Sequence, residues 1–362
     1  MISNFLDLLD DDALALLDVN GTQLIQKIGI DTAKDIVLDV MMGKNLRDST
    51  ELLTRRRLAA LNIAGVAMIL RGIQIDADFL TQMPQLAEKI LKQKRISKAE
   101  RWLAQWVLGL TGKATQNILR DDPSLLTEYR TRYTKIYEDT INKTIVDFGT
   151  LSGDIILNQQ KITEINWQFM LYLMGMIGAQ TSTIRGSEKS LYGKLFEKLV
   201  LGSLLHVLGF NFSKNGQPTE FEKEFWLSST GERESDATAL WGAGKGARFD
   251  IGFIGRGNTE ISLDKVSRFK REIELGQSTW YMATIVIVDR IGEKSNIREL
   301  AQNINGDIVQ MSMAYWPQEV AQILARRMQF EHPLVNMPRS EIKDYLTDAM
   351  KHVPLRDLLL VE

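Results

Sequence analysis

The chain has 362 residues, of which 44% are hydrophobic and 25% are charged, and its formal net charge is -2. This composition excludes wholesale disorder, and the length suits two domains or one large domain with a helical extension. There are no cysteines, which excludes disulfides, thiolate zinc sites and cysteine nucleophiles. Because the net charge is close to zero, any contact with DNA has to come from local basic clusters.

No segment predicts targeting or membrane insertion. The first residues lack a basic start and a small-residue cleavage site. The longest apolar stretch, from Met170 to Ala179, is too short to cross a bilayer. The sequence therefore predicts a cytoplasmic protein with no membrane partner.

Residues 1 to about 185 are predicted to be almost entirely helical. Leucine, alanine, methionine and charged residues dominate this region, and apolar positions recur every three or four residues. Breaks between helices are expected at turn-forming residues: Asn20-Gly21, Gly43-Lys44, the vicinity of Pro84, Asp121 to Pro123, and Ser152-Gly153. We take this region, 1–185, as the first domain.

From Ser187 the pattern changes, and residues 186–362 form the second predicted domain. The expected elements follow in chain order: a helix over 188–208, strands near 221–228, 234–241 and 247–254, a helix over 260–275, a strand over 282–289, a helix over 296–304, a strand over 307–313, and C-terminal helices. The strand at 282–289 is an uninterrupted β-branched run, which is typical of a central buried strand. The order α-β-β-β-α-β predicts an α/β (α+β) fold with a mixed sheet flanked by helices.

Two aspartates bracket a predicted β-hairpin. Its turn, Gly242 to Gly246, holds three glycines in five residues, which suits a tight reversal. Side chains alternate between the two faces of a strand, so Asp236 and Asp250 share one face when the two arms pair about the turn. Two carboxylates held close together repel unless a cation or a shared proton lies between them. The hairpin therefore predicts a metal site.

Two further charged residues lie on apolar helical lines. Glu197 aligns with leucines of the 188–208 helix, and Lys265 aligns with apolar residues of the 260–275 helix. Burying unpaired charges costs about several kcal/mol, so both are candidates to meet the aspartate pair. Glu260 and Arg268 belong to a neighbouring line that either frames the same site or is a solvated stripe. The ordinary alternative is that the helix residues reach water and the aspartates only form turns.

Several segments together resemble a known nuclease fold. The run from Arg248 to Arg268, the segment Tyr192 to Glu197 and the Glu234-Ser-Asp236 triplet resemble the PD-(D/E)XK fold of type II restriction endonucleases, whose minimal core has the same α-β-β-β-α-β order. Over most of the chain, including Leu53 to Arg57 and Thr183 to Ser187, the sequence is similar to the CfrBI type of these enzymes. The short signature is degenerate, and the 248–268 run is far more specific.

The resemblance implies roles for the acidic residues. Asp236 and Asp250 would bind Mg²⁺, and Glu197 would support the metal through water. The family pattern has a lysine two residues after Asp250, where this chain has Gly252. We expect Lys265 to supply the missing ammonium group.

Two alternatives to this assignment stay open. If Lys265 does not act, Lys245 or Lys198 could supply the ammonium. A rival register pairs Asp250 with Glu260 and leaves Ser262 in the lysine position, but it would shorten the third strand.

The function implied is that of a type II restriction endonuclease, which hydrolyses double-stranded DNA with Mg²⁺ at a short palindrome of the CCWWGG kind. A palindrome suits a two-fold homodimer. Region 1–185 would serve DNA recognition or dimerisation, and region 186–362 would be catalytic. The residues expected to contact DNA are Arg55, Arg56, Arg57, Arg185, Lys189 and Arg268. Two other functions stay open: a repair nuclease or junction resolvase of the same fold, and a non-catalytic DNA-binding module in which Gly252 marks a decayed site.

Overall fold

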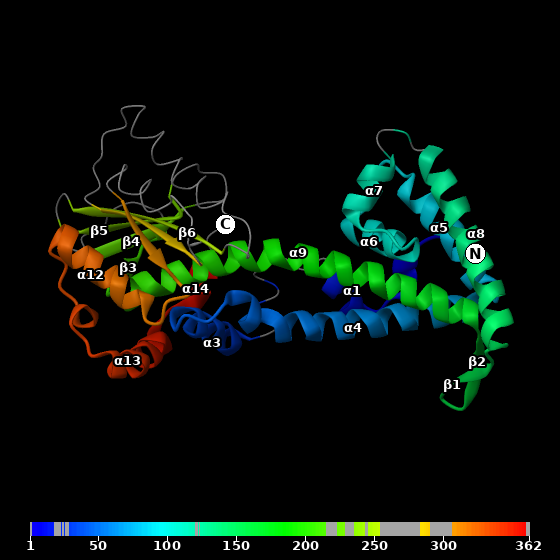
Figure 1. Cartoon of the computed structure of the whole chain (residues 1–362), viewed down its shortest axis with the longest axis horizontal. Helices are drawn as coiled ribbons and strands as arrows, with labels where there is room; N and C mark the ends of the chain where they lie inside the picture. The colour runs from blue at the N-terminus through cyan, green and yellow to red at the C-terminus, as the bar shows by residue number, and fades with distance from the viewer. Residues whose placement is uncertain are drawn as a thin grey trace. The chain divides into compact units, whose positions relative to one another are not determined.

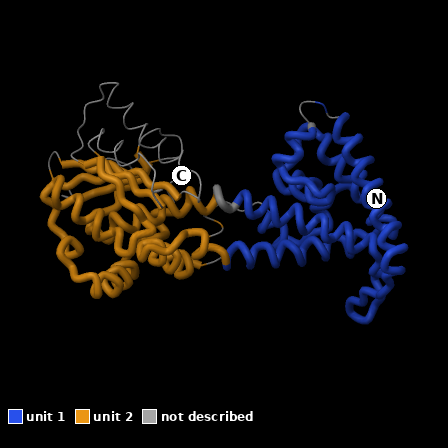
Figure 2. The backbone as a smooth tube through the Cα atoms, in the orientation of Figure 1, with its two compact units in different colours: residues 1–19, 52–188 blue, residues 20–51, 189–362 orange. Residues whose placement is uncertain are grey.

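The structure is a computed structural model that describes residues 2–17, 23, 25, 29–119, 122, 124–214, 223–228, 235–242, 245–253, 283–289 and 306–359, with the side chains of 119 and 188–190 excepted. The chain divides into two compact units (Figure 2). The helical unit comprises residues 1–19 and 52–188, and the sheet unit comprises residues 20–51 and 189–362. Two of the three boundaries fall inside long helices, α4 (Leu46–Ile75) and α9 (Trp167–Val207), and the third falls between residues 19 and 20.

The helices of the helical unit (Figure 1) pack around an apolar core. Besides parts of α4 and α9 it contains η1 (Phe5–Leu8), α1 (Asp11–Leu17), α5 (Phe79–Leu91), α6 (Lys98–Val107), α7 (Gly112–Leu119), α8 (Ser124–Phe148), β1 (Gly153–Leu157) and β2 (Gln160–Ile165). Its centre holds large side chains that are almost fully buried, such as Phe79, Met83 and Trp106. The predominance of helix agrees with the periodicity of the sequence.

Local sequence signals explain where two of these helices begin and why a third continues. Ser97 caps α6 through a capping box, in which its side chain accepts from the N–H of Glu100 and the Glu100 carboxylate accepts from the N–H of Ser97. At the start of α8, Asp122 accepts from the N–H of Ser124. The break predicted near Pro84 is wrong, because Pro84 lies inside α5 and is buried there. A proline removes one helical hydrogen bond, and apolar burial of this helix outweighs that loss.

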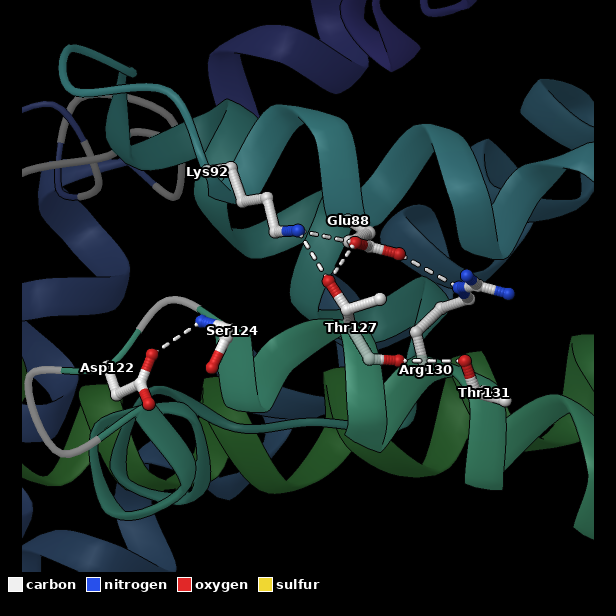
Figure 3. Close-up of polar contacts among 7 residues, drawn as sticks. All are labelled: Glu88, Lys92, Asp122, Ser124, Thr127, Arg130 and Thr131. Atoms are coloured by element: carbon white, nitrogen blue, oxygen red, sulfur yellow. Dashed lines mark hydrogen bonds and ion pairs between the residues drawn. The ribbon is translucent and has the colours of Figure 1, made fainter.

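A polar network joins α5 to α8 (Figure 3). The carboxylate of Glu88, which is only 7% exposed, accepts hydrogen bonds from Lys92 Nζ at 2.7 Å, Thr127 Oγ1 at 2.6 Å and Arg130 Nε at 2.8 Å. Burial alone would raise the pKa of Glu88, but these donors outweigh it and lower the pKa to about 2. The network therefore holds a fully ionised carboxylate between the two helices.

The helical unit also contains a β-hairpin that the sequence did not predict. Strands β1 and β2 pair antiparallel, and the two turn residues, Asn158 and Gln159, have φ values of 50° and 66°. Positive φ at both central residues is the geometry that two-residue hairpin turns require. Ile155 and Ile162 pack on the core, whereas Ile156 is 60% exposed. The expected all-helical region is thus helical with one hairpin.

Among the described helices, α4 alone has the length and apolar composition that could cross a membrane. In its most apolar 18-residue segment, 39% is buried inside the protein. Core helices of soluble proteins share this property. Leu58, Leu61 and Met68 of α4 lie in the core of the helical unit. The apolar character of α4 is thus accounted for in part by packing.

The described residues of the sheet unit form a mixed sheet, as predicted (Figure 1), and it has six strands, of which β3 was not predicted. The strand order is β3-β4-β5-β6-β7-β8; the β4-β5 and β5-β6 pairs are antiparallel, and the β3-β4, β6-β7 and β7-β8 pairs are parallel. The elements are α3 (Ile30–Met41), β3 (Asn211–Phe212), β4 (Lys223–Leu227), β5 (Ala237–Trp241), β6 (Gly246–Gly252), β7 (Ala283–Val288), β8 (Asp307–Gln310), α12 (Trp316–Met328), η2 (Pro333–Val335), α13 (Arg339–His352) and α14 (Leu355–Leu359).

The β-branched run of the sequence forms the buried strand β7, as expected. Helix α12 packs on β7 and β8, and Asp307 of β8 accepts hydrogen bonds from Arg326 at 2.6 Å and Arg327 at 3.0 Å. These ion pairs fix the helix to the sheet.

Residues 20–51 belong to the sheet unit, although the sequence placed all of 1–185 in one helical region. Helix α3 packs against α13 and α14, and the Trp316 indole donates to the carbonyl of Val40 at 2.9 Å. The predicted helix over 188–208 is the C-terminal part of α9. The predicted helices over 260–275 and 296–304 lie outside the described residues.

Candidate active site

The predicted aspartate pair lies where strands β5 and β6 run side by side. Ala237 pairs with Phe249 and Thr238 pairs with Arg248, so the register carried one residue further sets Asp236 opposite Asp250. Asp236 immediately precedes β5, and its Oδ2 accepts a hydrogen bond of 2.8 Å from the backbone N–H of Ile251. The hairpin and the proximity of its two aspartates agree with the sequence prediction.

Asp250 lies in the middle of the sheet. Its strand, β6, pairs with β5 on one side and β7 on the other, and the residue is 0% exposed. Alternation along the strands puts Arg248, Gly252 and Thr238 on the same face as Asp250. A carboxylate in such a place loses its hydration, which is costly unless charges or hydrogen bonds replace the water.

The donor set suits a hard divalent cation. Carboxylate oxygens are the ligands that Mg²⁺ takes from proteins, usually one or two per ion, with water and phosphate oxygens completing the octahedron. Within the described ranges, no three acidic or histidine side chains gather into a ready-made metal cage. The pair formed by Asp236 and Asp250 fits a site that is completed by water and by a DNA phosphate.

Helix α9 carries the predicted Glu197 and, next to it, Lys198, which interacts electrostatically with Asp236. Glu197 is partly buried on this helix. Burial lowers the pKa of the adjacent Lys198, and the negative charge of Asp236 acts in the opposite direction. Lys198 is therefore close enough to Asp236 to interact with it electrostatically.

Lys245, the other lysine considered as an alternative source of the ammonium group, makes its hydrogen bonds elsewhere. Lys245, at the turn end of the β5-β6 hairpin, donates to the carbonyl of Met328 at 3.2 Å and to Gln329 Oε1 at 3.5 Å. Of these two alternative lysines, Lys198 interacts electrostatically with Asp236, whereas Lys245 bonds to Met328 and Gln329. Glu260, Ser262, Lys265 and Arg268 lie outside the described residues, as does the side chain of Lys189.

The three arginines of α4 differ in their surroundings. Arg55 and Arg56 are exposed. Arg57 is only 4% exposed, and its Nε and Nη2 donate to the carbonyl of Leu16 at 3.2 and 2.9 Å. This carbonyl is near the end of α1, where helical carbonyls lack partners. Arg57 therefore supports the fold of the helical unit, and Arg55, Arg56 and the partly buried Arg185 stay as predicted DNA contacts.

The structure adds one acidic residue that sequence reasoning missed. Asp289 follows β7, and its N–H donates to the carbonyl of Gly252 at 3.3 Å. Its Oδ2 accepts from Asn45 Nδ2 at 3.1 Å. Because β6 and β7 are parallel, both strands end at the same edge of the sheet, where ligands bind in many α/β proteins. The sequence feature that could have identified Asp289 is its position directly after the β-branched run of β7.

The described residues form an α+β protein with a mixed sheet flanked by helices and two aspartates on neighbouring strands, and this architecture is consistent with the predicted restriction-endonuclease-like fold. Comparison with known proteins gives the family. The profile of the CfrBI restriction endonuclease family matches residues 30–296. The chain is also 37% identical over 355 residues to the type II restriction enzyme CfrBI of Citrobacter freundii, covering 95% of this chain and 96% of the relative. The chain therefore belongs to the CfrBI restriction endonuclease family and is a type II site-specific deoxyribonuclease. No solved structure matches it significantly.

Proposed function

We propose that this chain is an intracellular, Mg²⁺-dependent homodimer that cuts both strands of DNA at a short palindrome of the CCWWGG kind. The observation that carries the proposal is the hydrogen bond from Ile251 to Asp236, which fastens one acidic side chain beside Asp250 on the central strand β6. Family membership supplies the reaction class, and this pair supplies the place where a divalent ion would bind.

Each residue has a defined task in this proposal. Asp236 and Asp250 hold the ion, which when bound supplies the positive charge that lowers the pKa of water and stabilises a charged phosphate. The N–H of Ile251 keeps the Asp236 carboxylate turned towards β6. Glu197 orients water at the site, and Lys265 orients the attacking water beside the phosphate. Gly252 leaves the usual lysine position without a side chain.

The alternative functions predict different products from the same assay. Plasmid DNA is incubated with the purified chain in EDTA and then in excess Mg²⁺. Discrete fragments that appear only with Mg²⁺ support the proposal. Nicked circles or smears would favour a repair nuclease, and intact DNA under all conditions would favour a binding module.

The sequence preference is tested with paired duplexes. One duplex contains CCATGG and its matched control contains CCGCGG, which keeps the palindrome but replaces the central A·T pairs. Cutting of the first and not of the second supports a CCWWGG-type site. Equal cutting, or cutting of neither with fragments from plasmid, would overturn this part of the proposal.

A further inference from the structure

One face of the C-terminal half of α8 carries a row of opposite charges in alternation. Lys135, Asp139, Lys143 and Asp147 are spaced four residues apart, which places them along one side of the helix. All four are exposed. Among the residues the structure describes, none of these four side chains takes part in a hydrogen bond or ion pair. We call this row, with Ile136 and Val146, the α8 stripe.

Pairing within the helix accounts poorly for the stripe. Ion pairs four residues apart stabilise a helix best when the acid is N-terminal to the base. Only Asp139 and Lys143 follow that order, whereas Lys135 precedes Asp139 and Lys143 precedes Asp147. In addition, two aliphatic side chains flank the charges, Ile136 at 61% exposure and Val146 at 84%.

The stripe is complementary to itself when one copy is reversed. In chain order the charges alternate plus, minus, plus, minus, and in the reverse order they alternate minus, plus, minus, plus. A two-fold axis at the level of Ile141 that relates two antiparallel α8 helices therefore sets every charge opposite a charge of the other sign. Lys135 then faces Asp147 of the second copy, and Asp139 faces Lys143. The same operation sets Ile136 against Val146. A parallel arrangement would set like charges against each other.

We propose that the α8 stripe is a contact between two copies of this chain, with the two α8 helices antiparallel. The inference rests on the proposed homodimer and identifies its surface. An isologous contact of this kind is what a two-fold dimer requires. The stripe extends over about 18 Å of helix, and its two exposed aliphatic side chains, Ile136 and Val146, lie within the contact.

Charge reversal tests the contact in the full chain without DNA or metal. The substitutions Lys143→Asp and Asp139→Lys should each weaken the contact between the two copies. Each creates two pairs of like charges in the symmetric dimer, because residue 139 of one copy faces residue 143 of the other. We expect each single variant to raise the dimer dissociation constant at low salt by about tenfold. The double variant Asp139→Lys/Lys143→Asp restores complementarity, and so does an equimolar mixture of the two single variants. Sedimentation velocity measures the wild-type chain and these four samples, with Lys343→Asp on α13 as the control.

The outcomes separate this inference from the proposed function. If the wild-type chain is dimeric and the single variants dimerise equally well, the α8 contact is wrong and the homodimer stands. If the single variants dissociate but neither the double variant nor the mixture recovers, the antiparallel pairing is wrong. If the wild-type chain is monomeric at all concentrations, both the contact and the proposed homodimer fall, whereas Mg²⁺-dependent cleavage is measured separately.

Discussion

The carboxylate of Asp236 accepts a hydrogen bond of 2.8 Å from the backbone N–H of Ile251, the residue that directly follows Asp250. Asp236 comes from the arm of the hairpin opposite Asp250. The bond therefore holds the Asp236 carboxylate against β6, beside the backbone of Asp250, before any ion arrives. Fixed ligands lose less conformational entropy when a metal binds, which is the advantage of a preorganised site.

Removal of either carboxylate should abolish cleavage. In Asp236→Asn and Asp250→Asn the shape is kept and one metal-binding charge is lost. A catalytic metal contributes several kcal/mol, so we expect cleavage to fall by at least about a thousandfold. Electrophoretic mobility shift in Ca²⁺ or EDTA should show DNA binding largely intact. Wild-type cleavage by either variant would exclude that residue as a metal ligand.

The variant Asp236→Asn also tests metal binding directly. Mg²⁺ bound only to the folded state raises its melting temperature by mass action. We expect thermal unfolding of the wild-type chain to shift upwards with Mg²⁺ and that of Asp236→Asn to shift much less. An equal shift in both proteins would place the ion elsewhere.

The source of the ammonium group is tested by three single substitutions. Lys265→Ala should lower the single-turnover cleavage rate by about a hundredfold, since positioned proton-transfer groups contribute about that much. Lys198→Ala should lower it less than about tenfold. Lys245→Ala is the matched control, because this lysine donates to Met328 and Gln329. If Lys198→Ala has the larger effect and Lys265→Ala the smaller, the role belongs to Lys198, which interacts electrostatically with Asp236.

Truncation of Arg57 should lower the stability of the protein, whereas truncation of Arg56 should affect only DNA binding. Arg57→Ala removes two hydrogen bonds to the Leu16 carbonyl and buried packing, so it should lower the free energy of unfolding by about 1–3 kcal/mol. Arg56→Ala should leave stability within about 0.5 kcal/mol. If Arg56 contacts a phosphate, its loss should also reduce the salt dependence of DNA binding by about one unit of slope. Urea unfolding and binding titrations at several salt concentrations distinguish the two.

The Glu88 network should make the helical unit sensitive to acid. The folded-state pKa of about 2 lies below the ordinary value of 4.5. Stabilisation by the carboxylate is therefore complete above about pH 4.5 and is lost as the pH falls towards 2. After allowance for solvent screening, we expect Glu88→Gln to cost about 1–2 kcal/mol at neutral pH.

Urea unfolding of wild type and Glu88→Gln across this pH range measures the effect. The difference in unfolding free energy should shrink as the pH drops. Glu128→Gln is the control, because the Glu128 carboxylate pairs with Arg132 on the exposed surface of α8. A pH-independent difference would show that Glu88 acts through packing and not through its charge.

Periodicity in the sequence was enough to predict the helical region, the glycine turn and the strands β4 to β8 in their order along the chain, but not the short strand β3. These features follow from local preferences and alternation, which each segment carries in itself. Two local predictions failed for tertiary reasons: Pro84 stays in α5 because the helix is buried, and residues 153–165 form a hairpin whose inner residues pack on the core.

The sequence by itself determined that Asp236 and Asp250 share one hairpin, because residue parity and turn position depend only on spacing. Only the tertiary structure decided that Asp250 is buried between β5 and β7, that Arg57 serves the fold, and that Lys198 lies within electrostatic reach of Asp236. Burial and charge contacts arise between segments far apart in the chain, and no local pattern encodes them. The physical reason is that desolvation and electrostatic interactions depend on distance in space and not on separation in sequence.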